Sequence, residues 1–231
     1  MMKIRNIFYI GLLFLISTLG YAQGNFFLDS NGVTVKCTNC VNGDTGVVNG
    51  ITYTAYDTTS LYAKSKNDDD WNRVCTSLVT KTSYLFDNEL NFNQDISSWD
   101  TSNVINMKHT FYNAKSFNQD IGNWDTSSVT NMQGMFGFFL RFHNYSFNQD
   151  ISSWDTSNVT NMQGMFMSTS DRIHPFNQPL NNWDVSKVEN MYLMFGVVDG
   201  TNGQGAFNQP LNNWDVSNVR NMGAMFKGHK T

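Results

Sequence analysis

The chain has 231 residues, with 15 Lys and Arg against 19 Asp and Glu, which gives a formal net charge of −4. A mildly acidic chain without a basic run offers no electrostatic basis for binding nucleic acid or an anionic membrane surface. The sequence also contains no phosphate-binding loop, dinucleotide fingerprint, zinc-protease helix or nucleophile elbow, so no enzyme class is indicated.

Residues 1–22 have the pattern of a secretory signal peptide. Lys3 and Arg5 form a basic start, and Ile7 to Leu19 form an apolar run that is shorter than the ~20 residues of a membrane-spanning helix. Small residues at Gly20 and Ala22 predict cleavage after Ala22. We therefore expect an exported mature chain with no transmembrane segment. Loss of the two basic residues lowers its formal charge to −6.

Residues 23–69 are expected to form a small β-rich capping module. The β-branched run Val33 to Cys37 predicts a strand, and Asn49-Gly50 between β-rich arms predicts a hairpin over residues 46–54. A short helical turn is expected at Ser60 to Lys64. The module should cover the first face of the repeats that follow, because the end of a repeat array otherwise exposes apolar side chains.

Three cysteines, Cys37, Cys40 and Cys75, make an odd number for an exported chain. The Cys-x-x-Cys spacing lies among strand and turn signals and not at the start of a helix, so a redox motif is not favoured. The four histidines are scattered over separate repeats, so a zinc site is not favoured either. We expect a disulfide between Cys75 and either Cys37 or Cys40, with one thiol left over.

Residues 70–226 repeat one unit, which reads FNQDISSWDTSNVINMKHTF in the copy from Phe92 to Phe111. Four further copies open at Phe117, Phe147, Phe176 and Phe207, and a degenerate copy covers residues 70–91. Apolar letters at fixed positions predict that neighbouring copies bury them against each other in a stack. The short tail, residues 227–231, carries no polar cap, so we expect a truncated reading frame, a partner that covers the last copy, or self-association through it.

The fourth copy predicts the fold of the unit. Leu180, Trp183, Val185 and Val188 follow the apolar rhythm of a leucine-rich repeat, which favours a short strand. The spacing of apolar residues from Met191 to Phe195 favours one helical turn. The expected fold is an α/β repeat solenoid, a leucine-rich-repeat-like stack of short strands and helical turns in about six coils, with the β-rich module at its N-terminal end.

Two sets of equivalent residues are expected to form structural columns. The tryptophans should pack in the core. Each aspartate follows a tryptophan and should bond backbone N–H groups near the next Ser in an Asx-turn, an interpretation we favour over a Ca²⁺ site. No other cofactor is expected. The columns are Trp99, Trp124, Trp154, Trp183 and Trp214, and Asp100, Asp125, Asp155, Asp184 and Asp215.

The spacer between the second and third copies differs from the repeat because it is strongly aromatic. An exposed aromatic cluster on a loop is typical of a protein or carbohydrate contact, whereas the same residues could fold back over the neighbouring copy. The candidate ligand-binding loop consists of Phe138, Phe139, Arg141, Phe142, His143 and Tyr145.

The unit F-N-Q-[DP]-[IL]-x-x-W-D-[TV]-S-x-V-x-N-M-x-x-M-F resembles the repeat of BspA-type leucine-rich-repeat surface proteins of bacteria. The resemblance covers residues 70–226, and Val33 to Thr76 looks like the module that often precedes such repeats. It implies a secreted or surface-displayed bacterial protein that mediates adhesion or binding to a protein or glycan, with no catalytic residues to transfer. The alternatives are a structural spacer in a larger surface assembly and, less favoured, a glycan-acting enzyme.

Overall fold

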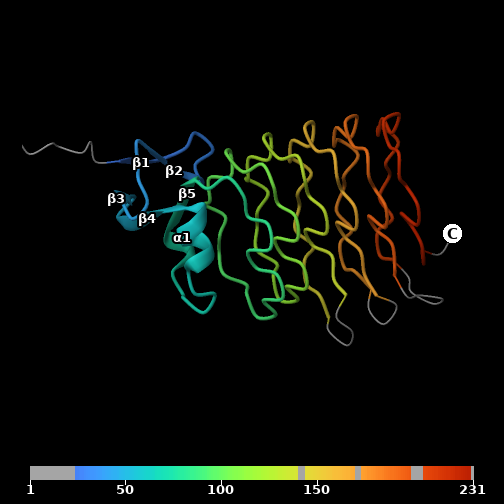
Figure 1. The fold of residues 1–231 in the computed structure, drawn as a ribbon, viewed down its shortest axis with the longest axis horizontal. Helices are drawn as coiled ribbons and strands as arrows, with labels where there is room; N and C mark the ends of the chain where they lie inside the picture. Colours follow the sequence, from blue (N-terminus) through green and yellow to red (C-terminus); the bar gives the residue numbers. More distant parts are fainter. Residues whose placement is uncertain (1–23, 140–143, 170–172, 199–204, 230–231) are drawn as a thin grey trace, which may run out of the picture.

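The computed structural model of the protein describes residues 24–139, 144–169, 173–198 and 205–229. Two parts follow each other along the chain in Figure 1: small β-sheets at the N-terminal end, and a stack of repeat copies lying side by side toward the C-terminus. The predicted signal peptide lies outside the described residues.

The N-terminal module contains two small sheets. Strands β1 (Asn25–Leu28) and β2 (Val35–Thr38) form an antiparallel pair, and β3 (Thr45–Val48), β4 (Ile51–Asp57) and β5 (Val74–Leu78) form the second sheet. The predicted hairpin is confirmed, since β3 pairs antiparallel with β4 across Asn49 and Gly50, whose φ angles are 52° and 80°. Two consecutive positive φ angles are the geometry for which Asn-Gly is selected.

Short helices connect this hairpin to the first repeat copy. Helix α1 (Thr58–Ala63) begins two residues before the predicted helical turn, because the Asp57 carboxylate accepts the N–H of Ser60 and caps its start. The 3-10 turn η1 (Trp71–Arg73) then leads into β5, which pairs parallel to β4. Among the described residues, no helix is long and apolar enough to cross a membrane.

The expected α/β solenoid of leucine-rich-repeat type is wrong. The described regular structure is strands in two small sheets with very little helix, and both short helices precede the copy at Phe92. The segment from Leu180 to Val188 forms turns and no strand, and Met191 to Phe195 forms turns and no helix. Over the described ranges, strand-like pairing between copies is limited to isolated parallel bridges. They join equivalent residues at Lys81, Asn106, Asn131, Asn161, Asn190 and Asn221, and they also join Ser168 to Val197 in the segments that follow two copies.

The physical reason is that alternate backbone N–H groups bond to the next copy, while others between them close short turns to a carbonyl three residues earlier, as Thr110 does to Met107. The N–H groups of Met107, His109 and Phe111 donate to carbonyls of the next copy at 2.9, 2.8 and 2.9 Å. A helical turn would instead direct these donors to carbonyls four residues earlier in the same copy. Apolar spacing alone cannot distinguish these two bonding patterns, which is why the sequence suggested a helix.

The core consists of aromatic columns that run through the stack. Successive tryptophan rings lie nearly parallel: the centroids of Trp99 and Trp124 are 5.9 Å apart, and Trp124–Trp154 and Trp154–Trp183 are each 6.4 Å apart. Each indole N–H also donates to a backbone carbonyl of the preceding copy, as Trp154 does to Ile121 at 3.0 Å. The column therefore combines apolar burial with a satisfied polar group in each ring.

The two ends of the stack differ. At the N-terminal end, Lys64 and Lys66 place their ammonium groups 5.4 and 5.0 Å from the centre of the Trp71 ring, and the Trp71 indole N–H has no acceptor. In the last copy, Val216, Met222 and Phe226 are more than 40% exposed, whereas their equivalents in the preceding copy are buried.

Candidate functional site

Each copy places a residue in the left-handed backbone conformation at the same position, two residues after the Met of its Asn-Met pair, or after Thr82 in the degenerate copy. The φ angles at this position lie between 54° and 63° in all six copies. The residues, from the degenerate copy onward, are Tyr84, His109, Gly134, Gly164, Leu193 and Ala224. Each is preceded by a residue that also varies, namely Ser83, Lys108, Gln133, Gln163, Tyr192 and Gly223. We call these twelve residues the variable face.

The bulky residues on the variable face hold a costly backbone conformation. A left-handed φ costs an L-residue about 1–2 kcal/mol, whereas glycine adopts it freely. Gly134 and Gly164 show that this repeat accepts glycine at the position. Tyr84, His109 and Leu193 therefore carry side chains that the turn itself does not require. Strain kept at a position where the fold offers a relaxed alternative is a reason to examine it for function.

The two glycines form the floor of a shallow hollow on this face. The hollow has a volume of about 200 Å³, and its walls are formed by His109, Tyr112, Gln133, Gln163, Met167 and Leu193. A Cβ on Gly134 would lie 2.4 Å from the His109 ring, and one on Gly164 would lie 2.9 Å from the Met167 sulfur. Because neither glycine has a side chain, the His109 ring and the Met167 side chain can lie directly against the backbone here.

The hollow carries no formal charge near neutral pH. None of its lining residues is a carboxylate, a lysine or an arginine. Burial, with a smaller contribution from Lys108, lowers the pKa of His109 to about 4, so its ring is neutral at pH 7. Burial likewise raises the pKa of the Tyr112 phenol to about 12, so this hydroxyl stays protonated.

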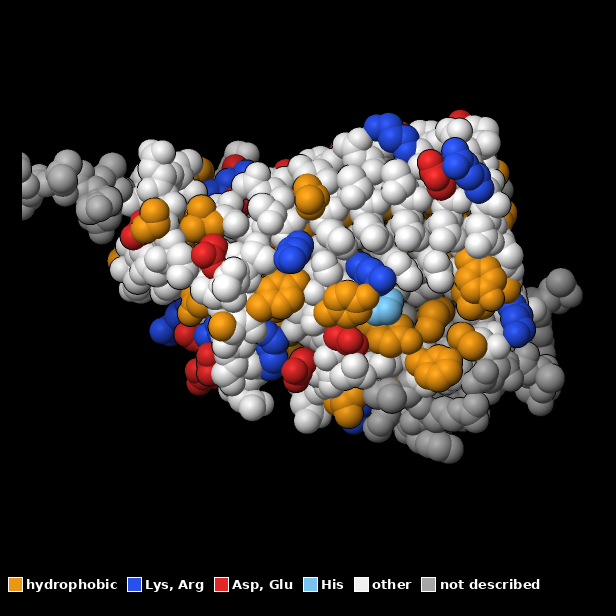
Figure 2. Space-filling model, viewed as in Figure 1, with side chains coloured by type: hydrophobic (Ala, Val, Ile, Leu, Met, Phe, Trp, Pro, Cys, Tyr) orange, Lys and Arg blue, Asp and Glu red, His pale blue; other side chains and the backbone are white. Residues whose placement is uncertain are grey.

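Aromatic rings continue the variable face toward the N-terminal end. The His109 ring stacks on Tyr112 at 4.4 Å and meets Tyr84 edge-on at 5.0 Å, and the Lys108 ammonium lies 5.6 Å from the centre of the Tyr84 ring. Tyr84 and Tyr192 remain 47% and 38% exposed. Figure 2 shows hydrophobic side chains and one histidine gathered in a band across the copies.

The predicted aspartate column lies elsewhere and forms local turns. Each Asp accepts the backbone N–H of the Ser two residues later, at 3.2 Å for Asp100 and between 2.9 and 3.0 Å for Asp125, Asp155, Asp184 and Asp215. The side chain and then the backbone N–H of Ser186 lower the pKa of the Asp184 carboxyl, and the backbone N–H and then the side chain of Ser217 lower that of Asp215. Within the described residues, no three His, Cys, Asp or Glu side chains are grouped as metal ligands would be.

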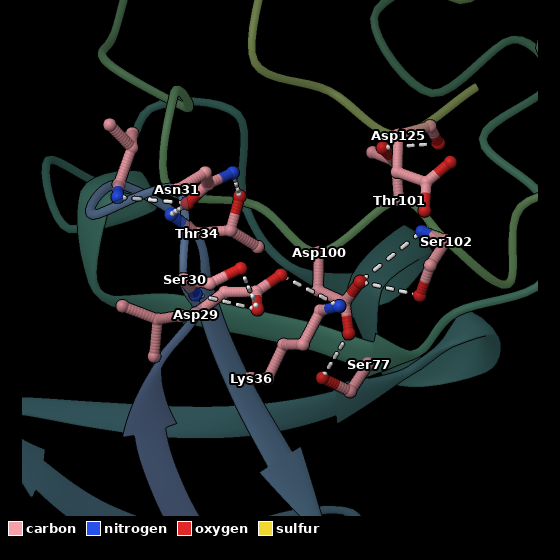
Figure 3. A network of polar contacts seen from close by, with 12 residues as sticks. Asp29, Ser30, Asn31, Thr34, Lys36, Ser77, Asp100, Thr101, Ser102 and Asp125 are labelled. Atoms are coloured by element: carbon pink, nitrogen blue, oxygen red, sulfur yellow. Dashed lines mark hydrogen bonds and ion pairs between the residues drawn. The ribbon is translucent and has the colours of Figure 1, made fainter. Parts of the chain in front are cut away.

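Asp100 also joins the first full copy to the N-terminal module (Figure 3). It is the most buried member of the column and accepts the hydroxyls of Ser77 at 2.6 Å and Ser102 at 2.7 Å. Lys36 of β2 forms an ion pair with Asp29 at 2.8 Å, which raises the Lys36 pKa, and nearby Asp100 adds to this effect. The network fixes the module on the stack.

The predicted aromatic loop is partly folded into the structure. Phe138 is fully buried, and its ring stacks on Tyr145 at 3.6 Å. Phe139 is 49% exposed, and its backbone N–H donates to the Asn113 side chain. Arg141, Phe142 and His143 lie outside the described residues. In the described part, only Phe139 offers an exposed aromatic surface, so this spacer carries less of the candidate site than the sequence indicated.

The predicted disulfide is not formed in this structure. Cys37, Cys40 and Cys75 are all free thiols, buried in one small core that also contains Val35 and Ala55. Cys75 donates weakly to the Val35 carbonyl at 3.5 Å, and burial raises the pKa of the Cys37 and Cys40 thiols. The cysteines pack as small apolar groups between β2 and β5.

The hollow itself was not predicted from the sequence. A signal did exist, because the two residues between the Asn-Met and Met-Phe pairs vary while those pairs recur. The left-handed turn that joins them into one face becomes visible only in the structure. Tyr112 and Met167 lie just after the end of their copies, outside the repeated unit. Their meeting in one hollow therefore depends on how the copies stack, which the sequence does not show.

Fold and site together define a repeat protein with a constant core and one chemically varied face. The family profile described as "Mycoplasma protein of unknown function, DUF285" matches residues 55–145 and 139–231, and the chain belongs to this family. This membership agrees with a bacterial surface repeat protein, while the narrower BspA-type assignment is not confirmed by it. Comparison with curated proteins and with solved structures gave no match.

Proposed function

We propose that the protein is an exported bacterial surface protein, related in role to the BspA-type proteins, that binds a protein or glycan ligand through its variable face. The observation that carries this proposal is the left-handed column. One left-handed backbone position presents Tyr, His, Gly, Gly, Leu and Ala in successive copies, although glycine would relieve the strain in the four copies that lack it. In this proposal the protein binds its ligand without catalysis and without a cofactor.

Chemical variety on a rigid frame supports binding. The first five residues of the column donate their backbone N–H groups to the next copy, as Gly134 does to the Gln163 carbonyl at 2.8 Å, so their side chains are held in register. Exposed tyrosines supply large contact area at low entropic cost. The fixed spacing of the copies suits a ligand that is itself extended, such as a polymer or a surface of another protein.

A levelled variant tests the proposal. Every copy is given the Gln-Gly pair that two copies already carry, through Ser83→Gln, Tyr84→Gly, Lys108→Gln, His109→Gly, Tyr192→Gln, Leu193→Gly, Gly223→Gln and Ala224→Gly. The variant should fold, because the turn accepts this pair without strain. Binding of the purified protein to arrays of glycans and extracellular-matrix proteins should weaken at least about tenfold, a loss of about 1.4 kcal/mol.

A second variable position supplies the matched control. The residue between the repeat's Val and its Asn-Met pair is exposed and differs among copies, with Thr at Thr130 and Thr160. Levelling this position through Ile105→Thr, Glu189→Thr and Arg220→Thr should leave binding unchanged. Binding that survives in the first variant and is lost in the second would show that the wrong face has been assigned. A folded wild-type protein that binds nothing on these arrays would instead favour the structural-spacer alternative.

Export has a separate test. Expression of the full chain in a bacterial host, followed by N-terminal sequencing of the protein found outside the cytoplasm, should give a mature chain that begins at Gln23. Intact Met1 on a protein that stays in the cytoplasm would contradict the proposed export.

A further inference from the structure

The hollow over Gly134 and Gly164 combines apolar walls with amide groups. His109 and Tyr112 supply rings, Met167 and Leu193 supply aliphatic surface, and Gln133 and Gln163 supply primary amides. Its volume of about 200 Å³ is below the ~300 Å³ at which pockets for drug-sized molecules begin, so it suits a single small ring. The lining is therefore polar and apolar without formal charge, and it comes from four neighbouring copies and from the segments that follow two of them.

The amides are oriented before any ligand arrives. The Oε1 atom of Gln163 accepts the side-chain N–H of Asn190 at 3.0 Å, and the Oε1 atom of Gln133 accepts that of Asn161 at 3.5 Å. Each Asn is fixed in turn, since its own Oδ1 accepts a backbone N–H two residues later, as Asn190 does from Tyr192 at 3.0 Å. The Nε2 groups of both glutamines have no acceptor among the described residues, so their N–H donors are available to a ligand.

We propose that this hollow binds one pyranose ring of a neutral glycan. The sugar's hydroxyl oxygens would accept hydrogen bonds from the Gln163 and Gln133 amides, and its C–H face would lie against the apolar walls. The inference rests on the proposed function, since it names the ligand class for part of the variable face.

The lining chemistry favours this occupant over others. An anionic sugar or phosphate group would require a cationic partner, and the lining contains none because His109 is neutral at pH 7. An extended peptide adds to an open strand edge, whereas the backbone N–H groups of His109 and Gly134 already donate to the next copy at 2.8 Å. A neutral sugar needs only donors, acceptors and a flat apolar surface, and the hollow offers these together.

The experiment measures sugar binding directly on the full protein. Saturation-transfer NMR and titration with methyl β-galactoside, methyl α-mannoside and N-acetylglucosamine, alongside a neutral-glycan array, identify the preferred ring. Gln163→Leu removes the amide donors and should raise the Kd of that sugar at least about tenfold. His109→Gly removes the ring wall at a position where glycine is unstrained, and should also weaken binding.

Gln178→Leu is the matched control, because it is the same substitution on a different side of the stack, where the amide donates to the Asn148 carbonyl at 3.0 Å. It should leave sugar binding unchanged, and circular dichroism melting should show that all three variants are folded. If no neutral sugar binds, or if Gln163→Leu and Gln178→Leu have equal effects, the assignment of this hollow is overturned. Should the levelled variant still lose a protein ligand in that case, the proposed function stands without it.

Discussion

Gly134 provides the sharpest test of how the variable face is built. Its φ is +59°, and a Cβ there would lie 2.4 Å from Cδ2 of His109. Gly134→Ala should therefore cost about 1 kcal/mol for the left-handed backbone, and about 1 kcal/mol more for displacing the His109 ring from its stack on Tyr112. For a chain of this size, a total of about 2 kcal/mol lowers the melting temperature by roughly 4–8 °C.

Two comparisons separate the backbone cost from the clash. Gly164→Ala has the same left-handed backbone, with φ +60°, but its Cβ would meet the flexible end of Met167 at 2.9 Å, so it should cost only about 1 kcal/mol. In a His109→Gly background, Gly134→Ala should also fall to about 1 kcal/mol, since the ring is gone. Urea denaturation followed by circular dichroism measures all four proteins. Equal costs for the two single alanine variants, with no relief in the double variant, would refute the reasoning.

Three further predictions concern the core. Trp154→Phe should cost about 1 kcal/mol more than Trp71→Phe in urea denaturation, because it removes the indole hydrogen bond to the Ile121 carbonyl, whereas the Trp71 N–H bonds nothing; equal costs would contradict this. Burial lowers the pKa of His174 from 6.5 to about 4, so its contribution to stability should be full above pH 6.5 and be lost as pH falls toward 4. His174→Gln should reduce this slope without abolishing it, because the pKa of His109 is lowered in the same way. The three buried thiols should react with a disulfide reagent only on the timescale of unfolding, and rapid labelling of the native protein would show that their core is open.

Local features of the fold were predictable from the sequence because neighbouring residues determine them. The Asn49-Gly50 turn needs two positive φ angles, and few other dipeptides supply them. The Asp-x-Ser turns likewise close within three residues, so the favoured interpretation of the aspartate column matches the hydrogen bonds. In both cases the decisive contact lies inside the segment that predicts it.

The fold of the copies was not predictable in the same way. The apolar spacing of Met191, Met194 and Phe195 fits a helix, but it fits equally well a turn whose N–H groups bond to the next copy, as Met191 does to Asn221 at 2.8 Å. The candidate site was hidden for a related reason. Glycine at Gly134 hints at a left-handed turn, whereas Tyr84 and His109 at the same position conceal it, because such residues rarely adopt positive φ.

The direction of the inter-copy hydrogen bonds has a consequence for how such a protein can change. From its Asn-Met pair to its final Phe, each copy that has a successor donates backbone N–H groups to that following copy. The residue just before the pair donates to the preceding copy, as Thr130 does to Ile105, and both bonds recur along the stack. One copy can therefore be lost or duplicated by recombination between the nearly identical coding segments while every remaining junction keeps its bonds. Each such event would lengthen or shorten the molecule by one layer and add or remove one pair of side chains from the variable face. The binding surface could thus change by whole copies during evolution, with each intermediate protein still able to fold.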